Sequence, residues 1–261
     1  MSNFHLNILT LFPEMFPGCL GTSLAGKALE RGDWSFNAIN IRDFKTDNHK
    51  TVDDTPYGGG AGMVMRADII ERALLSLNTS SRTPQAEGSP TTQEISRAAR
   101  NDSHRIGRKI YLSPRGKTLN QQLVKELSQE DSLTLLCGRY EGVDQRVLDA
   151  HEFEEISVGD YVLSGGEPAA LILMDACIRL LSGVMGNEDT ADNESFSINT
   201  GGLLEYPHYT RPAAWESANG QTYNVPEILK NGDHAKIEDW KRAQSLKITT
   251  QNRPDLLKKD V

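Results

Sequence analysis

The chain has 261 residues, enough for one large domain, or a main domain with a small second one, to bury a hydrophobic core. With 38% hydrophobic and 25% charged residues, and no window of roughly 18 apolar residues, the composition favours a soluble protein and argues against a membrane span. The net charge of −8 argues against a nucleic-acid partner for the chain as a whole, although basic residues cluster in two segments, 105–117 and 230–261.

The first part of the chain alternates short apolar runs with amphipathic stretches. This order is typical of β-α-β units, so we predict an α/β fold with a mostly parallel sheet and helices on its faces. The apolar runs are 6–12, 34–41, 108–113 and 132–138, and the amphipathic stretches are 23–32, 119–128 and 143–150. A longer helix is predicted from Glu167 to Leu181, with Asp175, Ile178 and Arg179 on one face or at its margin.

Two polar segments interrupt this pattern and divide the chain. Residues 79–105 are rich in Ser, Thr, Pro and charge, which predicts a flexible insertion within a main domain of residues 1–186. Residues 187–202 are acidic and rich in turn formers, which predicts a flexible linker. Residues 203–261 are then expected to form a small helical C-terminal domain. The basic side chains of its main helix either are solvated or contact nucleic-acid phosphates: Lys236, Lys241, Arg242 and Lys247.

Metal and export signals are missing from the sequence. Cys19, Cys137 and Cys177 form no C-x-x-C pair and are expected to be small core residues, and the six histidines match no metal template. We therefore expect no protein-bound catalytic metal. The N-terminus lacks the basic region, apolar run and cleavage site of a signal peptide, so we expect a cytoplasmic protein.

Glycine-rich stretches are the main candidates for binding a small molecule. Residues 21–27 resemble a phosphate-binding P-loop, but Ala28 stands where the motif needs Ser or Thr, so we interpret them as the start of an ordinary helix. Four other stretches are rich in glycine, 56–63, 111–117, 137–144 and 157–167. Three of these follow predicted strands, where an open α/β sheet forms its ligand crevice, and together they predict a small-molecule pocket.

Longer strings point to one family. YGGGAGM, YLSPRGK, LLCGRYEGVDQRV, ISVGDYVLSGGEPAALILMDACIRLLSGV, ESFSINTGGLLEYPHYTRP and WKRAQSLKITTQNRPDLL resemble the tRNA (guanine-N1)-methyltransferase family in order and spacing. The resemblance covers most of the chain outside residues 79–105. It implies a sheet with a deep trefoil knot of the SPOUT type, which the rarity of knots would otherwise exclude. It also implies a homodimer in which each active site is shared between subunits.

By the same resemblance the chain binds S-adenosylmethionine in the knot and methylates N1 of guanine 37, next to the anticodon of tRNA. The residues that it places around the methyl donor are Tyr111, Leu112, Ser113, Pro114, Gly138, Tyr140, Glu141, Gly142, Val158, Gly159, Tyr161 and Leu163. In the family Mg²⁺ assists the reaction, and acidic groups such as Glu141 are expected to attract it or to orient charge on substrate or donor.

Two catalytic residues are expected from the family positions. A base must remove the N1 proton of guanine, and Glu194 stands where the family has aspartate, with Asp192 as the second candidate. Arg179 matches the family's catalytic arginine and is expected to stabilise charge that develops on guanine O6. The C-terminal domain is expected to grip the anticodon stem, and the linker to become ordered when tRNA binds.

Three other functions are kept as alternatives. A knotted enzyme that methylates the ribose 2′-hydroxyl would not need the linker carboxylate. A catalytically silent, RNA-binding dimer would not need Glu194 or Arg179. A P-loop hydrolase is opposed by Ala28.

Overall fold

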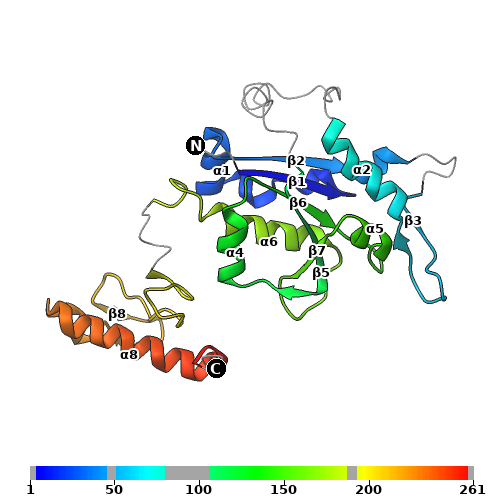
Figure 1. Cartoon of the computed structure of the whole chain (residues 1–261). Helices are drawn as coiled ribbons and strands as arrows, with labels where there is room; N and C mark the ends of the chain where they lie inside the picture. Colours follow the sequence, from blue (N-terminus) through cyan, green and yellow to red (C-terminus); the bar gives the residue numbers. More distant parts are fainter. Residues whose placement is uncertain (1–3, 46–50, 80–105, 187–192, 258–261) are drawn as a thin grey trace. The chain divides into compact units, whose positions relative to one another are not determined.

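A computed structural model of the chain describes residues 4–45, 51–79, 106–186 and 193–257. The chain divides into two compact units, residues 1–186 and 187–261 (Figure 1). Three features predicted from the sequence fall outside the described residues: positions 80–105 of the insertion, positions 187–192 of the linker, and Asp192, the second candidate for the base.

A five-stranded sheet forms the centre of the first unit, in the order β2-β1-β6-β5-β7 (Figure 1). Its strands are β1 Phe4–Thr10, β2 Trp34–Asn40, β5 Arg108–Thr118, β6 Ser132–Cys137 and β7 Glu154–Ser157. All four pairings are parallel, which confirms the predicted parallel α/β fold. Every residue of β1 and β6 is buried, as expected for strands that are covered on both faces.

Helices cover both faces of this sheet and bury two hydrophobic clusters. One cluster joins the strands to α1 Ser23–Arg31, α4 Gln121–Ser128 and α6 Gly166–Ile178. The other joins them to α2 Ala67–Thr79, α5 Gln145–Ala150 and the 3₁₀ turn η3 Ile41–Phe44. Side chains of β1 alternate between the two, because successive residues of a strand point to opposite faces: Leu6 and Ile8 lie in the first cluster and Leu9 in the second.

The sequence that resembles a P-loop, residues 21–27, contains the start of helix α1. Two 3₁₀ turns, η1 Pro13–Met15 and η2 Gly18–Gly21, separate it from β1, and an ordinary helix then begins at Ser23. A Cβ at Gly26 would stand 2.5 Å from the carbonyl oxygen of Gly21, so glycine is required there by close packing of the backbone. The prediction of an ordinary helix is confirmed.

Five elements differ from the predictions. Helix α6 ends at Ile178 rather than Leu181, because the next residues close tighter i to i−3 turns before Gly183 adopts a φ of +77°. Helix α2 and the two-residue strands β3 Asp53–Asp54 and β4 Val64–Met65 were not predicted. Stretch 111–117 was expected to follow a strand, but it lies within β5.

The second unit contains the predicted helix and an unpredicted hairpin. Helix α8, His234–Asn252, begins at Asp233, whose Oδ1 accepts a hydrogen bond from the Lys236 amide. The hairpin pairs β8 Ala214–Glu216 with β9 Thr222–Asn224, and two short 3₁₀ turns, η5 Glu227–Lys230 and η6 Pro254–Leu257, flank α8. The Leu204 amide donates to Thr249 Oγ1 at 2.9 Å and thereby fastens the preceding segment to α8. Among the described residues, no helix combines the length and apolarity needed to cross a bilayer.

Candidate active site

A cavity of about 310 Å³ opens at the carboxyl ends of β6 and β7 and at an irregular part of β5. All twelve residues that the resemblance places around a methyl donor line this one cavity. They come from three segments that lie apart in sequence, Tyr111–Pro114, Gly138–Gly142 and Val158–Leu163. Lining residues that were not predicted are Arg115, Arg139, Val143, Ile156, Ser157, Val162, Ser164, Gly165, Gly166 and Ala169.

The first wall of the cavity is made by a break in the register of β5. Leu112 and Lys117 both pair with Ile156 of β7, so the four residues between them leave the ladder. Gly116 must lie against the β7 backbone there, because a Cβ at this position would stand 2.3 Å from the carbonyl carbon of Glu155. Arg115 fixes the excursion on its outer side by donating to Gln145 Oε1 at 3.1 Å and to both Glu155 carboxylate oxygens at 3.2 Å.

The second wall is the loop after β6. Gly138 packs under Tyr111, since a Cβ on Gly138 would stand 2.9 Å from Cε2 and Oη of that ring. Burial raises the pKa of the Tyr111 phenol, so it stays neutral at physiological pH. Tyr140 and Gly142 have φ values of +59° and +125°, which turn the loop back toward α5.

Strand β4 holds this loop through backbone hydrogen bonds. The Met65 amide donates to the Gly142 carbonyl at 2.9 Å, and the Glu141 amide donates to the Met63 carbonyl at 2.9 Å. The side chain of Glu141 packs so closely on Gly62 that a Cβ there would stand 2.4 Å from Glu141 Oε1. The glycine-rich stretch 56–63 does not line the cavity itself, but it packs against Glu141, which does.

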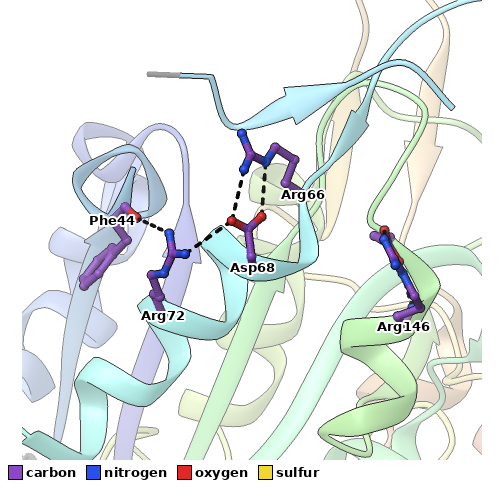
Figure 2. A network of polar contacts seen from close by, with 6 residues as sticks. Phe44, Arg66, Asp68, Arg72 and Arg146 are labelled. Atoms are coloured by element: carbon purple, nitrogen blue, oxygen red, sulfur yellow. Dashed lines mark hydrogen bonds and ion pairs between the residues drawn. The ribbon is translucent and has the colours of Figure 1, made fainter. Parts of the chain in front are cut away.

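Figure 2 shows the polar network that fixes the chain beyond β4. Arg66 donates from Nε and Nη2 to the two carboxylate oxygens of Asp68, both at 3.1 Å. Arg72 Nη2 lies 3.4 Å from Asp68 Oδ2, and its Nη1 donates to the Phe44 carbonyl at 3.4 Å. Because Arg66 directly follows Met65, this network supports the loop after β6.

The third wall follows β7. Ser157 Oγ accepts from the Gly159 amide at 3.2 Å and closes a tight turn. The Tyr161 ring lies over Gly159, where a Cβ would stand 2.5 Å from Cε1 of the ring. The Gly166 amide donates to the Gly138 carbonyl at 2.9 Å, so the second and third walls are joined by their backbones.

A buried ion pair beside the cavity was not predicted. Arg139 Nε lies 2.9 Å from Oε2 of Glu167, which is fully buried in the first turn of α6. The one signal in the sequence is a carboxylate at the start of an otherwise apolar helix. Its partner lies 28 positions earlier in the sequence, and nothing in the sequence identifies it.

The two predicted catalytic residues lie in different compact units. Arg179 is the half-buried C-cap of α6, in the first unit, and its amide donates to the Asp175 carbonyl at 3.1 Å. Arg179 does not line the cavity. Glu194 belongs to the second unit, is half-buried, and accepts at its carbonyl from the Ser197 amide at 3.1 Å. The described residues contain no group of three or more His, Cys, Asp or Glu side chains placed to hold a metal ion, so they do not build an Mg²⁺ site of that kind.

Comparison with known proteins identifies the family. A sequence model described as "tRNA (Guanine-1)-methyltransferase TrmD" matches residues 4–259. A tRNA (guanine-N(1)-)-methyltransferase of Rhodospirillum rubrum is 55% identical, over 95% of this chain and 90% of the relative. Proteins of the same name from Rhizobium etli and a Wolbachia pipientis strain are 51% and 50% identical, over 98% of this chain and 96% and 98% of the relatives. The chain therefore belongs to the tRNA (guanine-1)-methyltransferase family.

Proposed function

We propose that this chain transfers a methyl group from S-adenosylmethionine to N1 of guanine 37, on the 3′ side of the tRNA anticodon. One observation carries the proposal: three separate segments, matched to the donor-binding strings of the family, line a single cavity in a chain that belongs to that family. Because the proposed substrate is tRNA, we propose that the reaction takes place in the cytoplasm.

The cavity suits a purine nucleoside with a charged tail. A Cβ at Gly138 would collide with Tyr111, and a Cβ at Gly166 would collide with the Cys137 backbone. The walls therefore come together at positions where only glycine fits. Loops of this kind present backbone N–H and C=O groups to the edge of a base, while apolar side chains such as Leu112 pack on its face. S-adenosylmethionine supplies a methyl carbon that is activated by a sulfonium centre.

Glu194 and Arg179 are proposed to carry the chemistry at guanine. N1 bears a proton at neutral pH, so its lone pair is free to attack only when a base removes that proton. The proton moves from N1 to the Glu194 carboxylate, with Asp192 as the second candidate for this base. The electron density that shifts toward O6 is stabilised by the Arg179 guanidinium. The residues of the cavity walls would hold S-adenosylmethionine, which would supply the methyl group to N1.

The remaining parts of the proposal concern the assembly. The segment around Glu194 becomes ordered when tRNA binds, and residues 203–261 bind the anticodon stem-loop. We also propose that the cavity lies in a trefoil knot, which the family resemblance supports. A homodimer with shared active sites is supported by the exposed apolar side chains of Tyr161, Val162 and Leu163 in the third wall of the cavity.

Mass spectrometry of tRNA nucleosides tests the proposal. Unmethylated tRNA is incubated with the full-length protein and S-adenosylmethionine, and 1-methylguanosine is the expected product. A 2′-O-methylated nucleoside would support the ribose enzyme instead, and no methylated nucleoside would support the silent RNA-binding dimer.

Two variants test the assigned roles. Glu194→Gln keeps the shape of the side chain and removes the base, and Arg179→Ala removes the cation, so both are expected to lose at least about 100-fold in kcat. Donor binding should change less in Glu194→Gln. The exposed residues Glu216 and Arg31 provide matched controls, Glu216→Gln and Arg31→Ala, which should retain activity. Wild-type rates in Glu194→Gln would exclude Glu194 as the base.

A further inference from the structure

A fully buried carboxylate lies next to the cavity without lining it. Glu167 has 0% exposure, and its Oε1 accepts a hydrogen bond from Thr10 Oγ1, at the end of β1, at 2.7 Å. Its Oε2 lies 2.9 Å from Arg139 Nε. Because no solvent reaches Glu167, the carboxylate cannot touch a substrate, and any effect on the reaction must pass through its partners.

Arg139 is the partner that reaches the cavity. Its side chain is only 19% exposed, and the residue lines the cavity between Gly138 and Tyr140. Nη1 donates to the Ser164 carbonyl at 3.2 Å, on the third wall. The guanidinium carbon lies 4.4 Å from the centre of the Phe12 ring, just beyond β1. Arg139, which itself belongs to the second wall, thus contacts the third wall and the residue Phe12 just beyond β1.

The position of the Arg139 guanidinium depends on the negative charge of Glu167. A guanidinium that is largely removed from water needs a nearby negative charge, and Glu167 is the carboxylate that supplies it. Glu167 also lies in the first turn of α6, where the helix dipole favours a negative charge. The contact with Arg139 has the geometry of an ion pair rather than of an aligned hydrogen bond, so charge attraction holds the two groups together.

Gly165, directly before α6, leaves room for the Arg139 guanidinium because it has no side chain. A Cβ at Gly165 would stand 2.3 Å from Arg139 Nε, so the guanidinium lies directly on the Gly165 backbone. The next residue, Gly166, packs on Cys137, where a Cβ would stand 2.7 Å from the Cα atom. The two adjacent glycines therefore serve different contacts, and the first one accommodates Arg139.

We propose that Glu167 is a positioning residue for binding of the methyl donor. Through Arg139, with Thr10 holding the carboxylate in place, it sets the spacing between the second and third walls of the cavity. This inference rests on the proposed function, since it concerns the same cavity.

Binding of S-adenosylhomocysteine and steady-state kinetics, both on the full-length protein, test the proposal. Glu167→Gln keeps the size of the side chain and removes its charge. We expect the Kd for S-adenosylhomocysteine and the KM for the methyl donor to rise about tenfold, because the Arg139 guanidinium loses the buried charge that holds it in place. At saturating donor, kcat should stay within about twofold of wild type, because the groups at guanine are untouched. The matched control is Glu126→Gln, an exposed carboxylate on α4, which should leave Kd and KM unchanged.

A milder pair of variants covers the case in which Glu167→Gln does not fold. Thr10→Val removes the hydroxyl that donates to Glu167, whereas Thr10→Ser keeps it. Thr10 Oγ1 also accepts from the Phe12 amide at 2.9 Å, so Thr10→Val loses both contacts and should raise Kd about fivefold, whereas Thr10→Ser keeps both and should bind like wild type.

The outcomes are distinct. A purely structural role would lower the active fraction, so kcat would fall with KM and Kd unchanged, and that result would overturn the proposal. Unchanged Kd in both Glu167→Gln and Thr10→Val would also overturn it. Wild-type protein that does not bind S-adenosylhomocysteine would instead refute the proposed methyl donor, and the role of Glu167 with it.

Discussion

The ring of Tyr111 lies so close to Gly138 that one added methyl group would stand 2.9 Å from both Cε2 and Oη. This contact joins the first and second walls of the cavity, because Tyr111 lies on β5 and Gly138 follows β6. The cavity therefore depends on the absence of a side chain at residue 138.

Substitution of Gly138 by alanine should weaken binding of the methyl donor. The new Cβ must push Tyr111 aside, an over-packing that costs about 1–3 kcal/mol, and the displaced ring changes the wall. We expect a Kd for S-adenosylhomocysteine at least about tenfold higher, measured by isothermal titration calorimetry. Gly186→Ala is the matched control, since a Cβ there meets nothing within 4 Å, and its Kd should stay at the wild-type value. Equal affinities for the two variants would contradict the argument.

The buried phenol of Tyr111 should make stability fall at high pH. Burial raises its pKa above the usual 10.0, so above that pH the unfolded chain loses the proton while the native protein keeps it. The stabilisation is complete below pH 10.0 and is lost as the pH rises through the native pKa. Urea unfolding between about pH 9 and 11 should show a steeper decline for wild type than for Tyr111→Phe, by at most about 1.4 kcal/mol per pH unit. Parallel curves would show that Tyr111 does not titrate differently in the two states.

The three cysteines should react at different rates with iodoacetamide. Cys19 is exposed, whereas Cys137 and Cys177 are buried. Burial raises the pKa of Cys177 to about 12, and burial together with the charge of Glu167 raises that of Cys137 well above its usual value. Because the thiolate is the nucleophile, the native protein should be alkylated only at Cys19, and the urea-unfolded protein at all three positions. Peptide mapping distinguishes the sites, and rapid labelling of native Cys137 would show that the loop after β6 opens.

Loss of the cap of α4 should lower stability by a modest amount. Asn120 Oδ1 accepts from the Leu123 amide at 2.9 Å, and α4 buries Val124 and Leu127 against the sheet. Asn120→Ala should cost about 1 kcal/mol of unfolding free energy. That corresponds to a fall in Tm of roughly 2–4 °C in differential scanning calorimetry. Asn120→Asp preserves the acceptor and should unfold near the wild-type temperature, so an equal loss in both variants would exclude the cap as the cause.

The parallel sheet could be predicted because each of its strands and helices is marked by a pattern within a short stretch of sequence. Strands such as β1 and β6 are continuous apolar runs between turn residues, and α1, α4 and α5 have amphipathic spacing between them. Helix α2 carries a similar signal, because Ile69, Ile70, Ala73, Leu74 and Leu77 are buried at helical spacing, and this local pattern predicts a helix.

Other features depend on contacts between distant residues. Strand β4 has only two residues, and its position depends on a parallel β-bridge between Met65 and Val143. The break in β5 depends on Ile156 pairing twice, which no pattern within residues 108–118 encodes. The cavity residues were assigned through the resemblance of whole strings to a family, whereas Arg139 and Glu167 came only from the fold. The identity of the base at Glu194 stays a prediction.

The position of β6 has a consequence for synthesis of the chain. This strand pairs with β1 on one side and β5 on the other, yet it is made after both of them. A nascent chain that has not reached Ser132 therefore presents one edge of β1 without its final neighbour, although all seven residues of β1 are buried in the finished protein. Ribosome-released fragments that end before this point are expected to aggregate or to recruit chaperones, because an apolar strand edge without a neighbour is a template for pairing with other chains.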